Sequence, residues 1–120
     1  MFKCGIGIDL GTQITSAARK VDSTLVFVKD AGSHHIPSLV AYDDDEIFVG
    51  DTANTHKNVI FASKRLLGKK FGETCSRYLE SDADGYGVFR INHDTIRPER
   101  VSKDILQYVR GLHVIKSMTL

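Results

Sequence analysis

The sequence predicts a mixed α/β fold in which short strands come first and a helix comes last. Up to residue 50, apolar residues alternate with polar or small ones in short segments, and turn-forming residues separate the segments. From Pro98 onward the apolar residues recur at helical spacing instead. The chain has 120 residues, of which 42% are hydrophobic and 26% charged. That length and composition suit one small globular domain with a core of its own.

Five short strands are predicted in the first half of the chain. In segment 4–8 an apolar residue stands at every second position, which is typical of a strand with one buried face. The turn-forming stretch 9–12 follows it, and the acidic turn 43–46 separates the last two strands. The predicted strands span residues 4–8, 14–20, 25–29, 38–42 and 47–49.

The second half is predicted to be more helical. Asp51 is placed to cap a short helix through Ala53 to Asn58, and a second helical piece is predicted over 61–67, with Gly68 directly after it. A strand is predicted over 87–91.

The clearest helix begins at Pro98, a residue favoured at the first helical position. Its apolar face holds Val101, Ile105, Tyr108 and Leu112. Gly111 costs a helix about 1 kcal/mol relative to Ala, so the pattern predicts the last turns less strongly than the first ones.

Charge and cysteine content exclude several function classes. Sixteen Lys and Arg against 15 Asp and Glu give a net charge of +1, which provides no overall field for nucleic acid or an anionic membrane. No apolar run reaches the roughly 20 residues of a membrane span, and no signal peptide is evident. Cys4 and Cys75 are too few for a disulfide framework and are expected to be buried thiols. These features favour a cytoplasmic protein.

The segment Gly5-Ile6-Gly7-Ile8-Asp9-Leu10-Gly11-Thr12 carries the chemistry. It places a carboxylate at the end of a strand, directly before a tight glycine turn. Such a turn can direct backbone N–H groups at a phosphate, and Asp9 could hold Mg²⁺ through its waters. From this segment alone, a plain hairpin with Asp and Gly as turn formers is an equally good interpretation.

Further motifs follow in a specific order. They are Gly7-Ile8-Asp9-Leu10-Gly11-Thr12, Asp30-Ala31-Gly32, Pro37-Ser38-Leu39-Val40-Ala41-Tyr42, Gly50-Asp51-Thr52-Ala53, Phe61-Ala62-Ser63-Lys64-Arg65-Leu66-Leu67-Gly68-Lys69-Lys70-Phe71 and Ile96-Arg97-Pro98-Glu99-Arg100-Val101-Ser102. Together they resemble the N-terminal part of the ATPase domain in the seventy-kilodalton heat-shock (heat shock protein 70) chaperone family. The resemblance covers most of residues 5–109.

The resemblance implies the first lobe of a ribonuclease-H-like, actin-like ATPase domain that binds ATP or ADP with Mg²⁺. Asp9 would act on the metal, and the turn of Gly11, Thr12, Gln13 and Ile14 would contact the phosphates through backbone N–H groups. Lys64 would be the catalytic cation that reaches toward the γ-phosphate and the attacking water. Without the resemblance, Lys64 is one member of a basic cluster at a solvated helix end.

The sequence also departs from the family pattern. Gln13 and Ile14 replace the usual Thr and Tyr or Asn, and the tail 111–120 does not resemble the family. The second phosphate loop, the catalytic glutamate, the adenosine pocket and the substrate-binding domain are not found in the sequence. We therefore expect residues 1–120 to form one partial nucleotide-binding domain of a stress-response chaperone, inactive in hydrolysis by itself.

Two function classes remain open at this point. In a full-length relative the partners would be nucleotide, unfolded client proteins and co-chaperones. The alternative is a truncated, non-catalytic relative that acts as an interaction module.

Other candidate sites are weaker. His34-His35 lacks the ligand spacing of a zinc site, and 82–85 is too short for a calcium loop. The basic run 64–70 lacks the interleaved aromatic residues of a nucleic-acid site.

Overall fold

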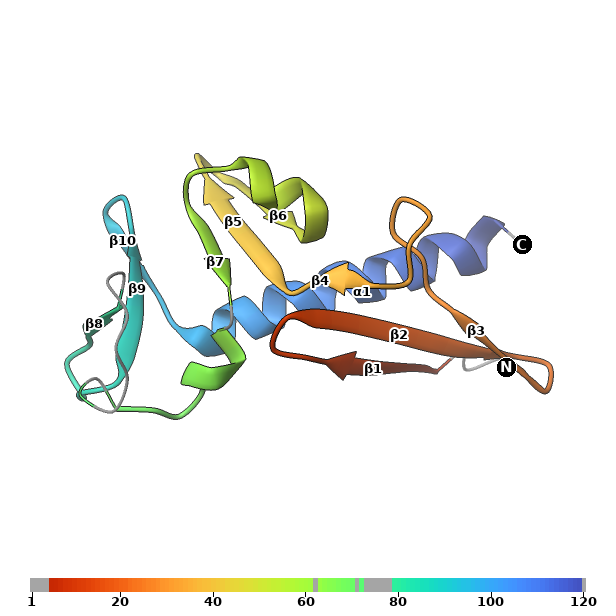
Figure 1. The fold of residues 1–120 in the computed structure, drawn as a ribbon, viewed down its shortest axis with the longest axis horizontal. Helices are drawn as coiled ribbons and strands as arrows, with labels where there is room; N and C mark the ends of the chain where they lie inside the picture. Colours follow the sequence, from red (N-terminus) through yellow and green to blue (C-terminus); the bar gives the residue numbers. More distant parts are fainter. Residues whose placement is uncertain (1–4, 62, 71, 73–78, 120) are drawn as a thin grey trace.

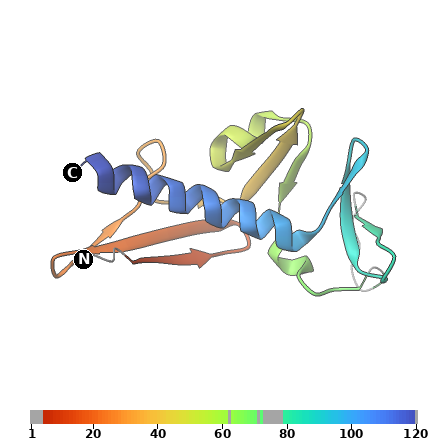
Figure 2. The same ribbon diagram turned by 180° about the vertical axis from the view of Figure 1, so that it is seen from behind.

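The computed structural model describes residues 5–61, 63–70, 72 and 79–119, and it is elongated, with extents of 48 × 26 × 24 Å (Figure 1). A single long helix, α1 (Pro98–Thr119), runs along most of the length of the molecule. Three small antiparallel sheets are arranged along this helix, as the view from behind also shows (Figure 2). The mixed sheet-and-helix composition confirms the predicted α/β class.

The first sheet is formed by the N-terminal strands, and the glycine turn lies between two of them. Strands β1 (Ile6–Leu10), β2 (Ile14–Val21) and β3 (Thr24–Phe27) follow one another in the order β1-β2-β3. The short strand β4 (Ile36–Pro37) pairs with the start of β2. Along β1 the exposed and half-buried residues alternate, which confirms the period-two prediction for this segment.

The second sheet has the order β6-β5-β7, with β5 (Leu39–Asp43) at its centre, β6 (Glu46–Val49) and β7 (Val59–Phe61). The short 3₁₀ helix η1 (Gly50–Thr55) connects β6 to β7. The 3₁₀ helix η2 (Ser63–Leu66) follows β7.

The third sheet has the order β10-β9-β8 and lies at the opposite end of the molecule from β3 (Figure 1). Its strands are β8 (Leu79–Ser81), β9 (Gly87–Ile91) and β10 (Asp94–Ile96), and α1 begins directly after β10.

The core lies between α1 and the sheets. Of the predicted apolar face of α1, Val101 and Ile105 are buried, at 0% and 2% exposed, and Tyr108 and Leu112 are partly buried against the same cluster, which Val109 also joins. Leu66 of η2 and the apolar residues of β1 pack against the same cluster. The buried cluster consists of Ala17, Val28, Ile36, Val40, Tyr42, Val49, Ile60, Phe89, Ile91, Ile96, Val101, Ile105 and Val109.

Several predicted elements differ from the structure. Strands β4, β7, β8 and β10 were not predicted, because segments of two or three residues are too short to show a period. The helix predicted over 61–67 is wrong at its start, since Phe61 belongs to β7 and only Ser63–Leu66 is helical. Gly68 follows η2 with a φ of 72°, a conformation that suits its predicted place after a helix.

The prediction for the helix after β6 was also inaccurate. The helix predicted from Ala53 to Asn58 is the 3₁₀ helix Gly50–Thr55, and Asp51 lies inside its first turn, so Asp51 is not the cap. The structure places α1 through Thr119, so the helix includes the last turns that the pattern predicts less strongly. The expectation of buried thiols concerns Cys4 and Cys75, which lie outside the described residues.

Two tyrosine–carboxylate hydrogen bonds fasten α1 to the strands and loops beside it. The hydroxyl of Tyr42 donates to Asp104 Oδ2 at 2.6 Å, and the hydroxyl of Tyr108 donates to Asp30 Oδ2 at 2.8 Å. Burial and the hydrogen bond to Asp30 raise the pKa of Tyr108 to about 12. Burial and Asp104 raise the pKa of Tyr42 as well.

Alkaline pH is therefore expected to destabilise the fold through Tyr108. In the unfolded chain a tyrosine ionises near pH 10, whereas in the folded chain Tyr108 keeps its proton up to about pH 12. The folded state then binds more protons between these values, so its stability is complete below pH 10 and is lost as the pH rises toward 12. Urea unfolding at pH 8, 10 and 11.5 measures this slope.

The variant Tyr108→Phe is expected to lower stability at pH 8 by about 1 kcal/mol and to flatten the alkaline slope. Tyr86→Phe, at a tyrosine that is 39% exposed, is the matched control. Equal slopes in the original protein and in Tyr108→Phe would contradict this assignment.

Candidate functional site

Residues 11–13 connect β1 to β2, and with Ile14, the first residue of β2, they form a tight turn, the turn 11–14. The last paired residues before it are Leu10 and Thr15, so only four residues reverse the chain. A Cβ atom added to Gly11 would overlap the carbonyl oxygen of Ile14. The turn can form in this shape only because residue 11 has no side chain.

The turn is partly exposed, and two of its backbone N–H groups have no partner among the described residues. Gln13 is exposed, Ile14 is 45% exposed and Thr12 is half-buried. The N–H groups of Thr12 and Gln13 donate to none of the residues that the structure describes. Unpaired successive N–H groups in a tight turn are the donors of an anion-binding nest.

Asp9 lies one residue before the end of β1, opposite Ser16 of β2. Its side chain is on the exposed face of the strand, while Ile8 and Leu10 are half-buried against the core. Among the described residues, none forms a hydrogen bond or an ion pair with the Asp9 carboxylate. The carboxylate is therefore open to a cation beside the turn.

Lys64 comes to the same place from a distant part of the sequence. It lies in η2, whose residues Ser63 and Leu66 are buried and half-buried, so the helical turn is anchored and the Lys64 side chain is exposed. Its Nζ donates to the carbonyl oxygen of Leu10 at 2.7 Å, across 54 residues of sequence. An ammonium has three N–H donors, so two remain available beside the turn.

The structure thus brings all six predicted site residues to one region at the β1–β2 turn. They are Asp9, Gly11, Thr12, Gln13, Ile14 and Lys64. The group has one carboxylate, one cation and a set of backbone donors. This donor set fits a phosphate group with Mg²⁺, because Mg²⁺ is usually held by one or two carboxylates together with phosphate oxygens and water.

Sequence reasoning missed two residues that support the turn from behind. Ser38 donates from its Oγ to the carbonyl oxygen of Gly11 at 2.9 Å and lies 2.7 Å from the Thr15 hydroxyl. Nothing in the periodicity singles out a serine or threonine for this role. The sequence signal available was two small hydroxyl residues in neighbouring segments of the sheet.

The weaker metal candidates gain nothing from the structure. The described residues contain no group of three or more His, Cys, Asp or Glu side chains that could hold a metal ion. The ring of His34 packs against those of Phe27 and His35, with centroids 4.9 and 4.2 Å apart. Asp82 accepts the N–H groups of Asp84 and Tyr86 within its own turn.

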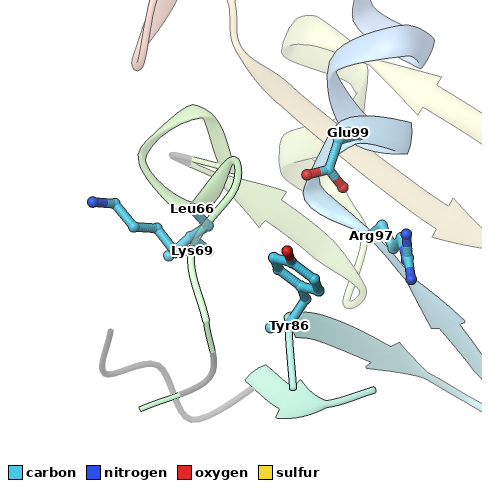
Figure 3. Close-up of a pocket in the computed structure, with 6 residues that line it drawn as sticks. Leu66, Lys69, Tyr86, Arg97 and Glu99 are labelled. Carbon is cyan, nitrogen blue, oxygen red and sulfur yellow. The ribbon is translucent and has the colours of Figure 1, made fainter. Parts of the chain in front are cut away.

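A separate pocket lies between η2, β9 and the start of α1 (Figure 3). Its volume is about 270 Å³, and it is lined by Leu66, Lys69, Tyr86, Gly87, Arg97 and Glu99. Arg97 is paired with Asp82 at 2.7 Å, and the Lys69 side chain points away from the other labelled residues. The hydrogen bonds from Tyr86, Asp84 and Arg97 hold the pKa of Asp82 below its usual range.

Comparison with known families decides what the chain is related to. The family model described as "Hsp70 protein" matches residues 5–114, which is nearly the whole chain. The chain belongs to the Hsp70 family. This match confirms the Hsp70 resemblance that was inferred from the ordered motifs. Membership of the family implies an actin-like ATPase lobe.

Curated Hsp70 relatives match along most of the chain. A heat shock cognate HSP70 protein of Trypanosoma brucei brucei is 30% identical over 92% of this chain. A chaperone protein DnaK of Psychrobacter cryohalolentis is 34% identical over 88% of it, and a ribosome-associated molecular chaperone of Saccharomyces cerevisiae is 29% identical over 93%. The match covers 19%, 18% and 21% of these relatives, so the chain spans about a fifth of their length.

Two of these relatives, the DnaK protein and the ribosome-associated protein, are named as molecular or protein chaperones. In the described part of the chain, α1 is the long helix, and it is too polar to cross a membrane.

Proposed function

We propose that residues 1–120 form one wall of a Mg²⁺-nucleotide site, as a partial nucleotide-binding domain of an Hsp70-type chaperone. The observation that carries this proposal is the 2.7 Å hydrogen bond from Lys64 Nζ to the carbonyl oxygen of Leu10. It places a cation from η2 directly beside the glycine turn and the strand end that carries Asp9. A hairpin that served only to reverse the chain would not require this distant lysine.

Each residue has a distinct part in the proposed site. The backbone N–H groups of the turn 11–14 bind phosphate oxygens, and Asp9 holds the hydrated Mg²⁺. When bound, Mg²⁺ neutralises phosphate charge. Lys64, oriented by the Leu10 carbonyl, directs its remaining N–H donors toward the terminal phosphate and stabilises charge there. Gln13 and Ile14 contribute through their backbone, which the substitutions relative to the family leave intact.

The activity of the whole protein is a further step of the proposal. Phosphoryl transfer to water needs donors on both sides of the phosphate and exclusion of bulk water, and one lobe provides a single wall. We infer that hydrolysis, client binding and co-chaperone contacts belong to a complete Hsp70 chain, of which this one carries the first part. The chaperone names of two relatives support this inference.

The proposed site predicts saturable binding of Mg²⁺-ADP and Mg²⁺-ATP that depends on Asp9. Isothermal titration calorimetry of the purified chain tests it. The variant Asp9→Ala is expected to weaken binding by about tenfold or more, because a charged ligand of the hydrated metal is lost. Asp45→Ala, at an exposed aspartate in the β5–β6 turn, is the matched control and should bind as the original does.

Two results would count against the proposal. Absence of binding heat from a chain shown by circular dichroism to be folded would favour the interaction-module alternative. Equal affinities of the Asp9→Ala variant and the original protein would remove Asp9 from the site.

A further inference from the structure

Two buried hydroxyl groups lie directly behind the turn 11–14. Thr15 is 0% exposed and Ser38 is 4% exposed, and they come from β2 and from the residue after β4. A buried hydroxyl is costly unless it is hydrogen-bonded. These two are bonded to each other at 2.7 Å, and Ser38 is bonded to the turn as well.

The direction of the hydrogen bonds follows from the number of protons. A serine hydroxyl has one proton, and that of Ser38 is donated to the carbonyl oxygen of Gly11 at 2.9 Å. Ser38 Oγ must therefore accept the proton of the Thr15 hydroxyl. The backbone N–H of Ser38 also donates, to the carbonyl oxygen of Gln13 at 2.8 Å. Ser38 thus binds two of the carbonyl groups in the turn.

The hydrogen bonds to the carbonyl groups also fix the directions of the N–H groups that follow them in the turn. In a planar trans peptide, the C=O group and the following N–H group point in opposite directions. With the Gly11 carbonyl held toward Ser38, the Thr12 N–H points away from it. With the Gln13 carbonyl held toward Ser38, the Ile14 N–H also points away from it. Both N–H groups therefore face the side of the turn away from Ser38.

We propose that Ser38 is the positioning residue of the phosphate-binding turn and that Thr15 fixes the Ser38 hydroxyl in its donating orientation. Ser38 touches no ligand itself. It turns two peptide planes so that their carbonyl dipoles face the interior and their N–H groups face an anion. This inference rests on the proposed phosphate site, because the outward N–H groups have a function only if an anion binds there.

The test combines ligand-free NMR with calorimetry on the full chain. Residual dipolar couplings report the directions of the Thr12 and Ile14 N–H bonds in the absence of ligand, and titration with Mg²⁺-ADP reports affinity. The variants Ser38→Ala and Thr15→Val remove one hydroxyl each, and Thr15→Ser retains it. Ser102→Ala, at a buried serine of α1, controls for loss of a buried hydroxyl elsewhere.

We expect Ser38→Ala and Thr15→Val to change the couplings of both N–H groups and to weaken Mg²⁺-ADP binding about tenfold. Thr15→Ser and Ser102→Ala should both keep the original couplings and the original affinity for Mg²⁺-ADP. Couplings that stay at their original values in folded Ser38→Ala and Thr15→Val would overturn the positioning role. If the original chain fails to bind Mg²⁺-ADP, the proposed function fails, while the couplings still decide whether Ser38 sets the turn.

Discussion

Replacing Gly11 by alanine is expected to abolish Mg²⁺-nucleotide binding and to destabilise the protein. The added Cβ atom would overlap the carbonyl oxygen of Ile14. The obstructing atom is backbone, so no side-chain rotation can relieve the overlap, and the turn itself must open. An opened turn loses the hydrogen bonds of Ser38 to Gly11 and Gln13 and therefore the directions of the N–H groups. Backbone strain of this kind costs on the order of 1–3 kcal/mol.

Gly7→Ala is the matched control for Gly11→Ala. Gly7 lies in the adjoining strand, β1, and a Cβ atom there would come no closer than 4.0 Å to the Ala18 carbonyl oxygen, an ordinary contact. Alanine in a strand interior loses less backbone entropy on folding than glycine, so this variant should be as stable as the original protein or slightly more stable. Urea unfolding and calorimetry with Mg²⁺-ADP measure both variants. Original affinity in Gly11→Ala would show that the turn can open without loss of the site.

The elements that the sequence predicts well are those with enough residues to show a period. The alternation in 4–8 places β1 correctly to within two residues, and the strand predicted over 87–91 is β9. The apolar face of α1 is the buried one. By contrast, β4 and β10 have two and three residues, and pairing with a longer neighbour determines them rather than their own pattern. Phe61 shows the same effect, because pairing with Leu39 extends β7 through it.

Some residues of the candidate site could likewise be predicted from the sequence, and others could not. Asp9 and the glycine turn are visible in a contiguous motif, because a carboxylate followed by glycine has a chemical meaning by itself. Lys64 has no such signal, since it stands among other basic residues, and only the resemblance to a family singled it out. Its partner is the backbone carbonyl group of Leu10. Every residue has such a group, so the residue type at position 10 gives no sign of this contact. Ser38 was missed for the same reason: its partners are carbonyl groups.

The largest loss of stability is expected from Ile105→Ala. Ile105 is 2% exposed at the centre of the buried face of α1 and belongs to the cluster that joins this helix to the sheets. Removing a buried isoleucine side chain beyond Cβ costs about 2–5 kcal/mol, from lost burial and from the cavity left behind. A domain of this size has a total stability of about 5–15 kcal/mol, so this single change takes a large share of it. Alanine is the better helix former, so helix propensity opposes the loss and cannot account for it.

Leu106→Ala separates the packing effect from helix propensity. Leu106 is the next residue of the same helix and is 37% exposed, so its truncation leaves a much smaller cavity. Urea unfolding should show a loss for Ile105→Ala several times that for Leu106→Ala. Equal losses would mean that α1 is not packed through this face.

Because β1 and η2 both contact α1, unfolding of the helix interface would also separate Lys64 from the Leu10 carbonyl. Mg²⁺-ADP affinity in Ile105→Ala should therefore fall together with the folded fraction as urea is added, whereas Leu106→Ala should retain the original affinity over the same range.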